Sequence, residues 1–156
     1  MKFPPDVWGP FYWHVIHIVA LGYPKTPTYS DKKAAKEFFE SLQFLLPCSV
    51  CRKHYTQHFQ NNPITPALDT RDALIKWTID IHNQVNKMLN KPVWTQDEVI
   101  AYYMRLGKIG RSPVWTSSDF AAADTKAFAR GAIIGGAATL LASAAIAYSL
   151  GLLADK

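Results

Sequence analysis

The sequence predicts an all-α protein: a four-helix bundle with a short fifth helix, followed by a C-terminal transmembrane helix. Two observations support this fold class. Through the first 106 residues, apolar side chains recur every three or four positions, and no segment shows the two-residue alternation of a strand. From residue 131 to residue 154 there is no charged side chain. A length of 156 residues suits one compact domain with a short appendage.

The first two helices are separated by a proline-rich loop at 24–27. The first helix stops at Gly22-Tyr23-Pro24. Its apolar residues recur at helical spacing, at Val7, Phe11, Val15, Ile18 and Gly22. The second helix spans 31–46, and one of its faces is formed by Ala35, Phe38, Leu42 and Leu45.

Three further helices complete the predicted bundle domain, residues 1–106. Pro47 opens the third, from Cys48 to about Gln60, because proline is tolerated in a first turn. The fourth covers about 70–90, with its inward residues at Leu74, Trp77, Ile81, Val85 and Met88. Thr95 and Glu98 form a capping-box pattern that starts a short fifth helix to Leu106. Four amphipathic helices with short loops favour a small bundle.

The C-terminal part is predicted to be a linker, 107–118, and then a helix, 119–156, that holds a membrane anchor at 131–154. The uncharged run reaches about 35 Å as a helix, enough to cross a hydrocarbon core of roughly 30 Å. Lys126 and Arg130 precede it, which favours a cytosolic position for the bundle. The alternative is a buried or self-associating soluble helix, because the run is rich in Ala and Gly.

The charge pattern bears on the class of partner. The formal net charge is +5, and the basic residues are scattered along the chain. A nucleic-acid-binding protein more often carries a dense basic stripe, so no nucleic-acid partner is expected.

The only two cysteines, Cys48 and Cys51, lie three apart at a predicted helix N-terminus. There, unpaired N–H groups and the helix dipole favour a thiolate, and the pair can exchange with another dithiol. A redox role, a shared metal or no role are the three interpretations. His54 and His58 follow on the same helix, but four ligands on one rigid helix cannot form a tetrahedral zinc site. No metal site within the chain is therefore predicted.

Two other clusters bear polar or aromatic side chains suited to a ligand. One is the aromatic run from Trp8 to Trp13 with His17, which is otherwise a set of core aromatics. The other groups His82, Asn83 and Asn86 on adjacent stripes of the fourth helix, beside an apolar stripe. The alternative for that cluster is a solvated helix face.

Taken together and in order, these clusters resemble the Erv/ALR family of flavin-dependent sulfhydryl oxidases. The resemblance covers roughly Trp8 to Tyr103. The matching pieces are Trp8-Gly9-x3-Trp13-x3-His17, Tyr23-Pro24, Pro47-Cys48-x2-Cys51-x2-His54-Tyr55 and His82-Asn83-x-Val85-Asn86-x2-Leu89-x-Lys91-Pro92.

The resemblance implies a bundle, often homodimeric, that binds FAD beside the CxxC motif. It implies that Cys51 lies on the flavin side and that Cys48 exchanges with a dithiol protein substrate, expected to be thioredoxin-like. Electrons would then pass to O2, releasing H2O2. The implied FAD contacts are Gly9, Trp13, His17, His82, Asn83, Val85, Asn86, Lys91 and Trp94.

The chain departs from the family pattern in two ways. Pro10 stands where many members have Arg, and the additional cysteines of shuttle arms are missing from this sequence. A single CxxC resembles the minimal forms of large DNA viruses, which form disulfides during virion assembly. In that setting the anchor would lie in a membrane of the host cytoplasm or of the virion. The rival hypotheses are a membrane-tethered helical adaptor with a structural or zinc-binding CxxC, and a thioredoxin-type oxidoreductase, which the absence of predicted strands disfavours.

Overall fold

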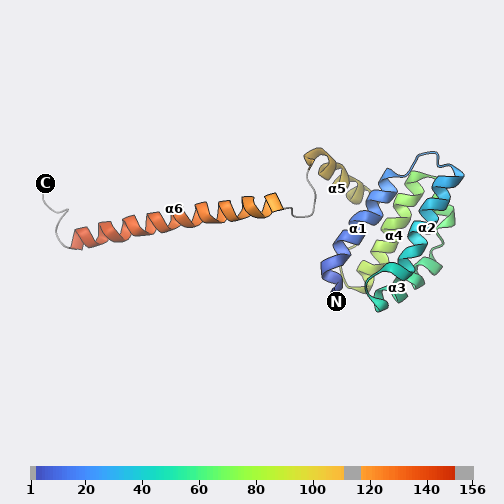
Figure 1. Ribbon diagram of the computed structural model, residues 1–156, viewed down its shortest axis with the longest axis horizontal. Helices are drawn as coiled ribbons and strands as arrows, with labels where there is room; N and C mark the ends of the chain where they lie inside the picture. Colours follow the sequence, from blue (N-terminus) through green and yellow to red (C-terminus); the bar gives the residue numbers. More distant parts are fainter. Residues whose placement is uncertain (1–2, 111–116, 150–156) are drawn as a thin grey trace. The chain divides into compact units, whose positions relative to one another are not determined.

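The computed structural model describes residues 3–110 and 117–149, and within these ranges it contains helices and no strand. The chain divides into two units, Met1–Gly110 and Arg111–Lys156. The first unit holds α1 (Pro5–Gly22), α2 (Tyr29–Leu45), α3 (Ser49–Asn61), the 3-10 helix η1 (Thr65–Asp69), α4 (Arg71–Met88) and α5 (Gln96–Ile109) (Figure 1). The all-α class and the bundle are as the sequence predicts; η1 was not expected.

Helix α4 lies in the middle of the bundle, between α1 and α2 (Figure 1). Its Trp77 ring meets Phe39 of α2 and Phe59 of α3 edge to face, with centroids 5.2 and 5.7 Å apart. Leu74 and Ile81 of the same helix are fully buried. The core therefore sits around α4, and every other helix of this unit except α2 approaches it closely along the backbone.

The apolar spacing that predicts α1 lies on its exposed side. Val7, Phe11, Val15 and Ile18 are about half exposed, whereas Ile16, His17 and Ala20 are buried. Both sides of α1 are apolar, so periodicity alone could not identify the inner one. In α2 the buried residues are Ala35, Phe39 and Leu42, and Leu46 just after the helix is buried as well. Phe38 packs against the core while partly exposed, as predicted, whereas Leu45 is exposed.

The boundaries of the last bundle helix also differ from the prediction. The capping box of Thr95 and Glu98 is present, but α5 continues to Ile109, because Gly107 keeps helical geometry. The helix ends where Gly110 adopts a left-handed conformation with φ 64°. Half of the predicted linker, residues 111–116, and the end of the predicted anchor, 150–154, lie outside the described residues.

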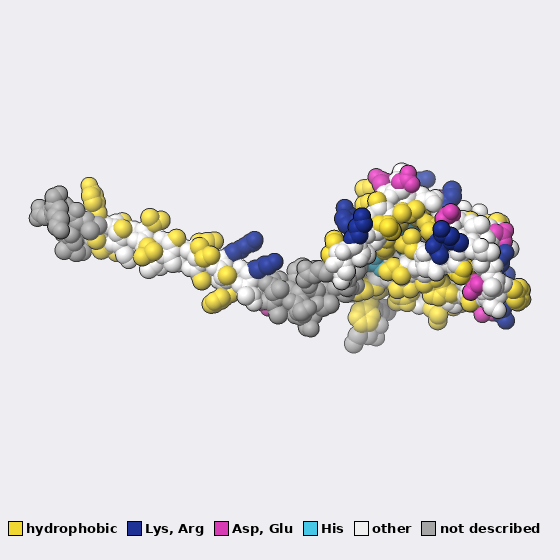
Figure 2. Space-filling model, turned by 90° about the horizontal axis from the view of Figure 1, so that it is seen from above, with side chains coloured by type: hydrophobic (Ala, Val, Ile, Leu, Met, Phe, Trp, Pro, Cys, Tyr) yellow, Lys and Arg dark blue, Asp and Glu magenta, His cyan; other side chains and the backbone are white. Residues whose placement is uncertain are grey.

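The second unit contains α6 (Ser117–Ser149). Its stretch Asp124–Ser149 contains an 18-residue window with a mean hydropathy of 1.6 and no buried residue, so the helix is long and apolar enough to cross a membrane. Figure 2 shows apolar side chains along α6 and basic side chains near its start, where Lys126 and Arg130 lie. On the bundle face in the same view, charges of both signs are scattered.

Candidate functional site

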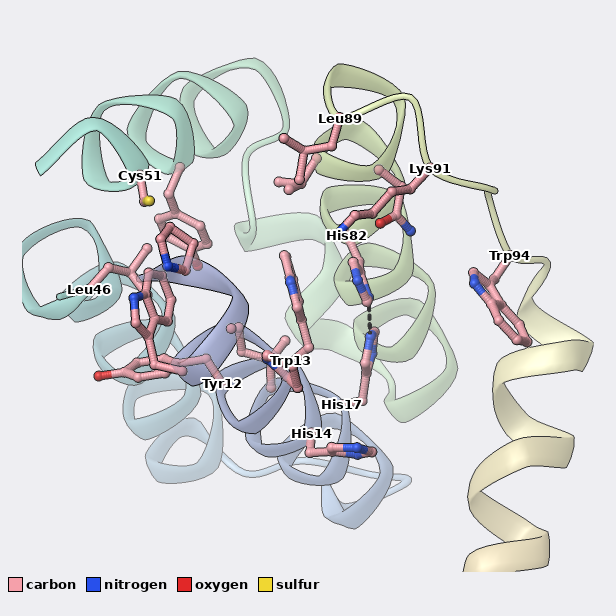
Figure 3. A pocket seen from close by; sticks show the side chains of 18 of the residues that line it. Tyr12, Trp13, His14, His17, Leu46, Cys51, His82, Leu89, Lys91 and Trp94 are labelled. Carbon is pink, nitrogen blue, oxygen red and sulfur yellow. Dashed lines mark hydrogen bonds between the residues drawn. The ribbon is translucent and has the colours of Figure 1, made fainter. Parts of the chain in front are cut away.

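A cavity of about 630 Å³ opens in the bundle, within the size range of ordinary ligand pockets. Side chains of α1, α3, α4 and α5 and of the segment 89–94 form its walls (Figure 3). Of the residues predicted to bind a cofactor, eight line this cavity: Gly9, Trp13, His17, His82, Val85, Asn86, Lys91 and Trp94. The structure thus brings together three sequence clusters that lie far apart in the chain.

The two cysteines form a disulfide at the beginning of α3. Cys48 is the N-cap residue, and its Sγ accepts a hydrogen bond from the backbone N–H of Cys51 at 3.2 Å. Cys51 lines the cavity, with its sulfur on the cavity side of α3 (Figure 3); Cys48 is not among the described lining residues. One end of the disulfide therefore meets the cavity and the other does not. Pro47 precedes the N-cap, so it lies just outside the helix it was predicted to open.

The indole of Trp13 stacks on the imidazole of His82, with ring centroids 3.9 Å apart and an interplanar angle of 7°. His82 Nδ1 lies 3.0 Å from His17 Nε2, and His17 Nδ1 lies 3.1 Å from Thr78 Oγ1 (Figure 3). The Thr78 hydroxyl, fully buried, donates to the carbonyl of Ile75 at 2.8 Å. A continuous hydrogen-bonded chain therefore runs from the cavity wall into the core.

Both imidazoles of this chain are neutral at physiological pH. Burial lowers the pKa of His17 to about 3, with smaller contributions from His82 and His14. Burial also lowers the pKa of His82 to about 4, assisted by the nearby positive charge of Lys91.

The C-terminal end of α4 fixes the position of Lys91. Leu89 is the C-cap and Asn90 follows with φ 54°, the left-handed conformation that asparagine tolerates better than most residues. The backbone N–H of Lys91 then bonds to the carbonyl of Asn86 at 2.8 Å, and that of Asn90 to Lys87 at 3.2 Å, which is a Schellman motif. This motif places the backbone of Lys91 against that of Asn86, a buried polar residue of the cavity wall, and both residues line the cavity.

Asn83 is the ninth residue that the sequence predicts to contact a cofactor. It is absent from the described residues that line the cavity, and its carboxamide pairs with the backbone of Trp94. Trp94, which lies on the segment between α4 and α5, does line the cavity (Figure 3). A direct ligand contact for Asn83 therefore stays a prediction.

The cavity wall also contains residues that the sequence did not single out, above all His14 and Tyr103. The Tyr103 hydroxyl lies 3.0 Å from His14 Nδ1, so α5 closes one side of the cavity against α1. Burial lowers the pKa of His14 and raises that of Tyr103. The three-residue spacing of His14 and His17 was a usable signal, whereas the contact with α5 was not readable from sequence.

In the described residues no group of three or more His, Cys, Asp or Glu side chains is arranged to hold a metal ion. In this helical bundle, one sulfur of the CxxC disulfide lies at a cavity lined by aromatic side chains. This is the architecture of a redox protein that pairs a dithiol with a cofactor that contains aromatic rings. The chain belongs to the Erv1/Alr family, whose model matches residues 10–104.

Relatives in two viruses and one solved structure are similar to this chain. A protein of Acanthamoeba polyphaga mimivirus, named a probable FAD-linked sulfhydryl oxidase, is 45% identical over 97 residues, 62% of this chain and 68% of the relative. The FAD-linked sulfhydryl oxidase of African swine fever virus is 31% identical over 117 residues, 70% of this chain and 97% of the relative. The FAD-binding domain of Erv1 from Saccharomyces cerevisiae matches with a TM-score of 0.60 and 28% identity, over 71% of this chain and all of that domain.

Proposed function

We propose that this protein is an FAD-linked sulfhydryl oxidase that forms disulfides in partner proteins. The observation that supports this most directly is the disulfide of Cys48 and Cys51, which has Cys51 on the cavity wall and Cys48 away from it. Such an arrangement separates a sulfur that serves a cofactor from a sulfur that serves a substrate.

The chemistry of the residues that line the cavity suits FAD. Its walls carry Trp8, Tyr12, Trp13 and Trp94, whose rings suit a ligand with two aromatic systems. Trp8 Nε1 is buried without a hydrogen-bond partner among the described residues, a donor that a ligand acceptor would satisfy. We assign FAD contacts to Gly9, Trp13, His17, His82, Val85, Asn86, Lys91 and Trp94, with the ammonium of Lys91 serving the pyrophosphate.

The protein's own residues carry the dithiol half of the reaction. A partner thiolate attacks Cys48 Sγ, and the bond to Cys51 breaks, leaving Cys51 as a thiolate at the N-terminal end of α3. The second partner thiolate then displaces Cys48, so the partner leaves with a disulfide and the pair is reduced by two electrons. FAD held by the cavity residues named above would supply a two-electron acceptor beside Cys51 and a route from the reduced pair to O2, with H2O2 as the product.

Purified protein tests this function directly. It should carry the visible absorption of a flavin and consume one O2 for each molecule of dithiothreitol oxidised, with H2O2 as product. A colourless protein, or one that leaves dithiothreitol reduced, contradicts the proposal. Zinc in such a colourless preparation would instead indicate the adaptor hypothesis.

We further propose that α6 anchors the protein in a membrane. From residue 131 to 149 the helix has no charged side chain, and these 19 residues would extend about 28 Å, close to the roughly 30 Å of a hydrocarbon core. The hydroxyls of Thr139 and Ser149 donate to the carbonyls of Gly135 and Ile146, at 2.9 and 2.8 Å, so these polar groups are satisfied within the helix as lipid requires. Lys126 and Arg130 favour a cytosolic bundle.

Membrane association is tested by carbonate extraction of cells that express the full chain. The protein should stay with the membranes, whereas Leu140→Arg combined with Leu141→Arg should release it, because arginine at mid-span costs about 3 kcal/mol each. Leu141→Ala is the matched control and should remain bound. Protease added to sealed vesicles whose cytosolic face points outward should digest the bundle. A bundle protected from the protease would show that the orientation is opposite to the one proposed.

A second copy of the chain is the proposed partner for α1. Val7, Phe11, Val15 and Ile18 form one exposed apolar stripe along that helix, between 47% and 53% exposed. Val15→Lys should convert a dimer into a monomer in sedimentation experiments on detergent-solubilised protein. A wild-type monomer would rule the dimer out.

A further inference from the structure

Three exposed apolar side chains flank Cys48 in the chain, whose sulfur does not line the cavity among the described residues. Phe44 and Leu45, at the end of α2, are 75% and 64% exposed, and Val50, in the first turn of α3, is 56% exposed. Cys48 lies between them in the chain, at most four residues from each. We call Phe44, Leu45 and Val50 the apolar rim. Large apolar groups gathered at one place on a surface mark contact sites more often than chance exposure does.

The same stretch of chain is entirely without negative charge. From Ser41 to Leu68 the sequence holds no Asp or Glu, while Arg52 and Lys53 follow the disulfide directly. Arg52 donates from its guanidinium to the carbonyl of Leu46 at 2.6 Å, which keeps its charge close to the rim, and Lys53 is exposed. The positive end of the α3 dipole adds to this field. An acidic partner would therefore be attracted and a basic one repelled.

We propose that the apolar rim is the docking surface for the substrate protein, and that it selects dithiols flanked by apolar and acidic residues. This inference rests on the sulfhydryl oxidase function proposed above. Its chemistry requires an occupant, because a partner sulfur must come within bonding distance of Cys48 Sγ. As that bond forms, the Cys48–Cys51 bond breaks and Cys51 keeps the electron pair; the second partner thiolate then displaces Cys48 and leaves the partner oxidised. Whatever protein undergoes this exchange covers the residues on both sides of Cys48.

Two synthetic peptides provide the probe. Each contains one Cys-x-x-Cys dithiol; the first has Leu and Glu around it, and the second has Ser and Lys in their places. For the full-length protein in detergent, kcat/KM on the first peptide should exceed that on the second by about tenfold or more. Added salt should reduce the difference, because part of it is electrostatic.

The variants separate docking from chemistry. Phe44→Ser combined with Leu45→Ser, both outside the CxxC motif, should remove the preference between the peptides, and Lys53→Glu should reduce it. Dithiothreitol, which is too small to need a docking surface, should be oxidised at a rate within about twofold of wild type. The control is Tyr29→Ser, an equally exposed aromatic at the opposite end of α2, which should leave all three rates unchanged.

Binding without any redox step completes the test. A fluorescent form of the first peptide with Ser in place of both Cys should bind wild type and lose about tenfold in affinity with the double variant. If dithiothreitol is not oxidised but this peptide still binds the rim, the oxidase function fails while the docking surface stands. Equal rates on both peptides, unchanged binding by the double variant, or dissociation of a dimer by it would each overturn the docking surface.

Discussion

The carboxamide of Asn83 holds the backbone of Trp94 at both of its hydrogen-bonding groups. Trp94 N–H donates to Asn83 Oδ1 at 2.9 Å, and Asn83 Nδ2 donates to the Trp94 carbonyl at 2.7 Å. Trp94 is outside any helix and half exposed, so this pairing substitutes for the secondary structure that would otherwise hold its indole at the cavity.

Asn83→Asp should therefore weaken FAD binding by about tenfold, because an oxygen replaces the donor that faces the Trp94 carbonyl. Fluorescence titration of flavin-free protein measures this. In a Trp94→Ala background, Asn83→Asp should reduce the affinity for FAD much less, since the indole that Asn83 positions has been removed. An equal loss in both backgrounds would mean that Asn83 contacts FAD itself. Lys87→Ala, one turn further along α4, is the control.

Gly9→Leu should remove FAD while leaving the protein folded. A Cβ at Gly9 meets no atom of the protein within 4 Å, and Gly9 lies on the cavity wall, so the added side chain would occupy cofactor space. Leucine also favours a helix over glycine by roughly 0.5–1 kcal/mol, so the unfolding temperature of the flavin-free protein should not fall. Gly22→Leu, on the same helix and equally free of contacts, should retain its flavin. Full flavin content in Gly9→Leu would place the cofactor elsewhere.

Acid should destabilise the flavin-free bundle through its buried histidines. Their pKa values, about 3 for His17 and about 4 for His82, lie below the unfolded value of 6.5, so the unfolded chain binds more protons between these limits. Stability is complete above about pH 6.5 and decreases as the pH falls towards 4. The unfolding temperature should drop by about 5 °C or more from pH 7 to pH 5. His17→Gln should reduce this dependence of the unfolding temperature on pH. An unchanged dependence would show that the histidines are not buried in their neutral form.

Cys48→Ser and Cys51→Ser should each abolish dithiol oxidation while FAD stays bound, because the sequence offers no other cysteine. Their spectra should differ. Cys48→Ser leaves a free Cys51 on the cavity wall, and a thiolate next to a flavin gives a long-wavelength charge-transfer band. If the band appears in Cys51→Ser instead, Cys48 is the cysteine next to the flavin and Cys51 is the one that reacts with the substrate. Turnover above a few per cent of wild type in either variant would refute the mechanism.

The sequence predicted the helical class and eight of the residues that meet in the cavity, since each cluster combined a helical period with chemically distinctive side chains. It did not predict the inner side of α1, because Val7 and Phe11 are as apolar as the residues that α1 buries. It could not predict the pairing of Asn83 with Trp94, which depends on how the segment after α4 returns to that helix. The role of Thr78 could not be predicted either, because a single threonine inside an amphipathic helix forms no recognisable sequence motif.

The hydrogen bonds from Thr78 to His82 have a direction, and this direction limits what can bind. The hydroxyl of Thr78 donates its only hydrogen to the Ile75 carbonyl, so Thr78 Oγ1 can only accept the hydrogen bond from His17 Nδ1. A neutral His17 then has a bare Nε2, which accepts from His82 Nδ1. The remaining nitrogen of His82, Nε2, is left as a lone pair. A polar atom that contacts this nitrogen must therefore be a hydrogen-bond donor. A hydroxyl or an amino group of the cofactor can bind there, whereas a phosphate or carbonyl oxygen, which can only accept, cannot.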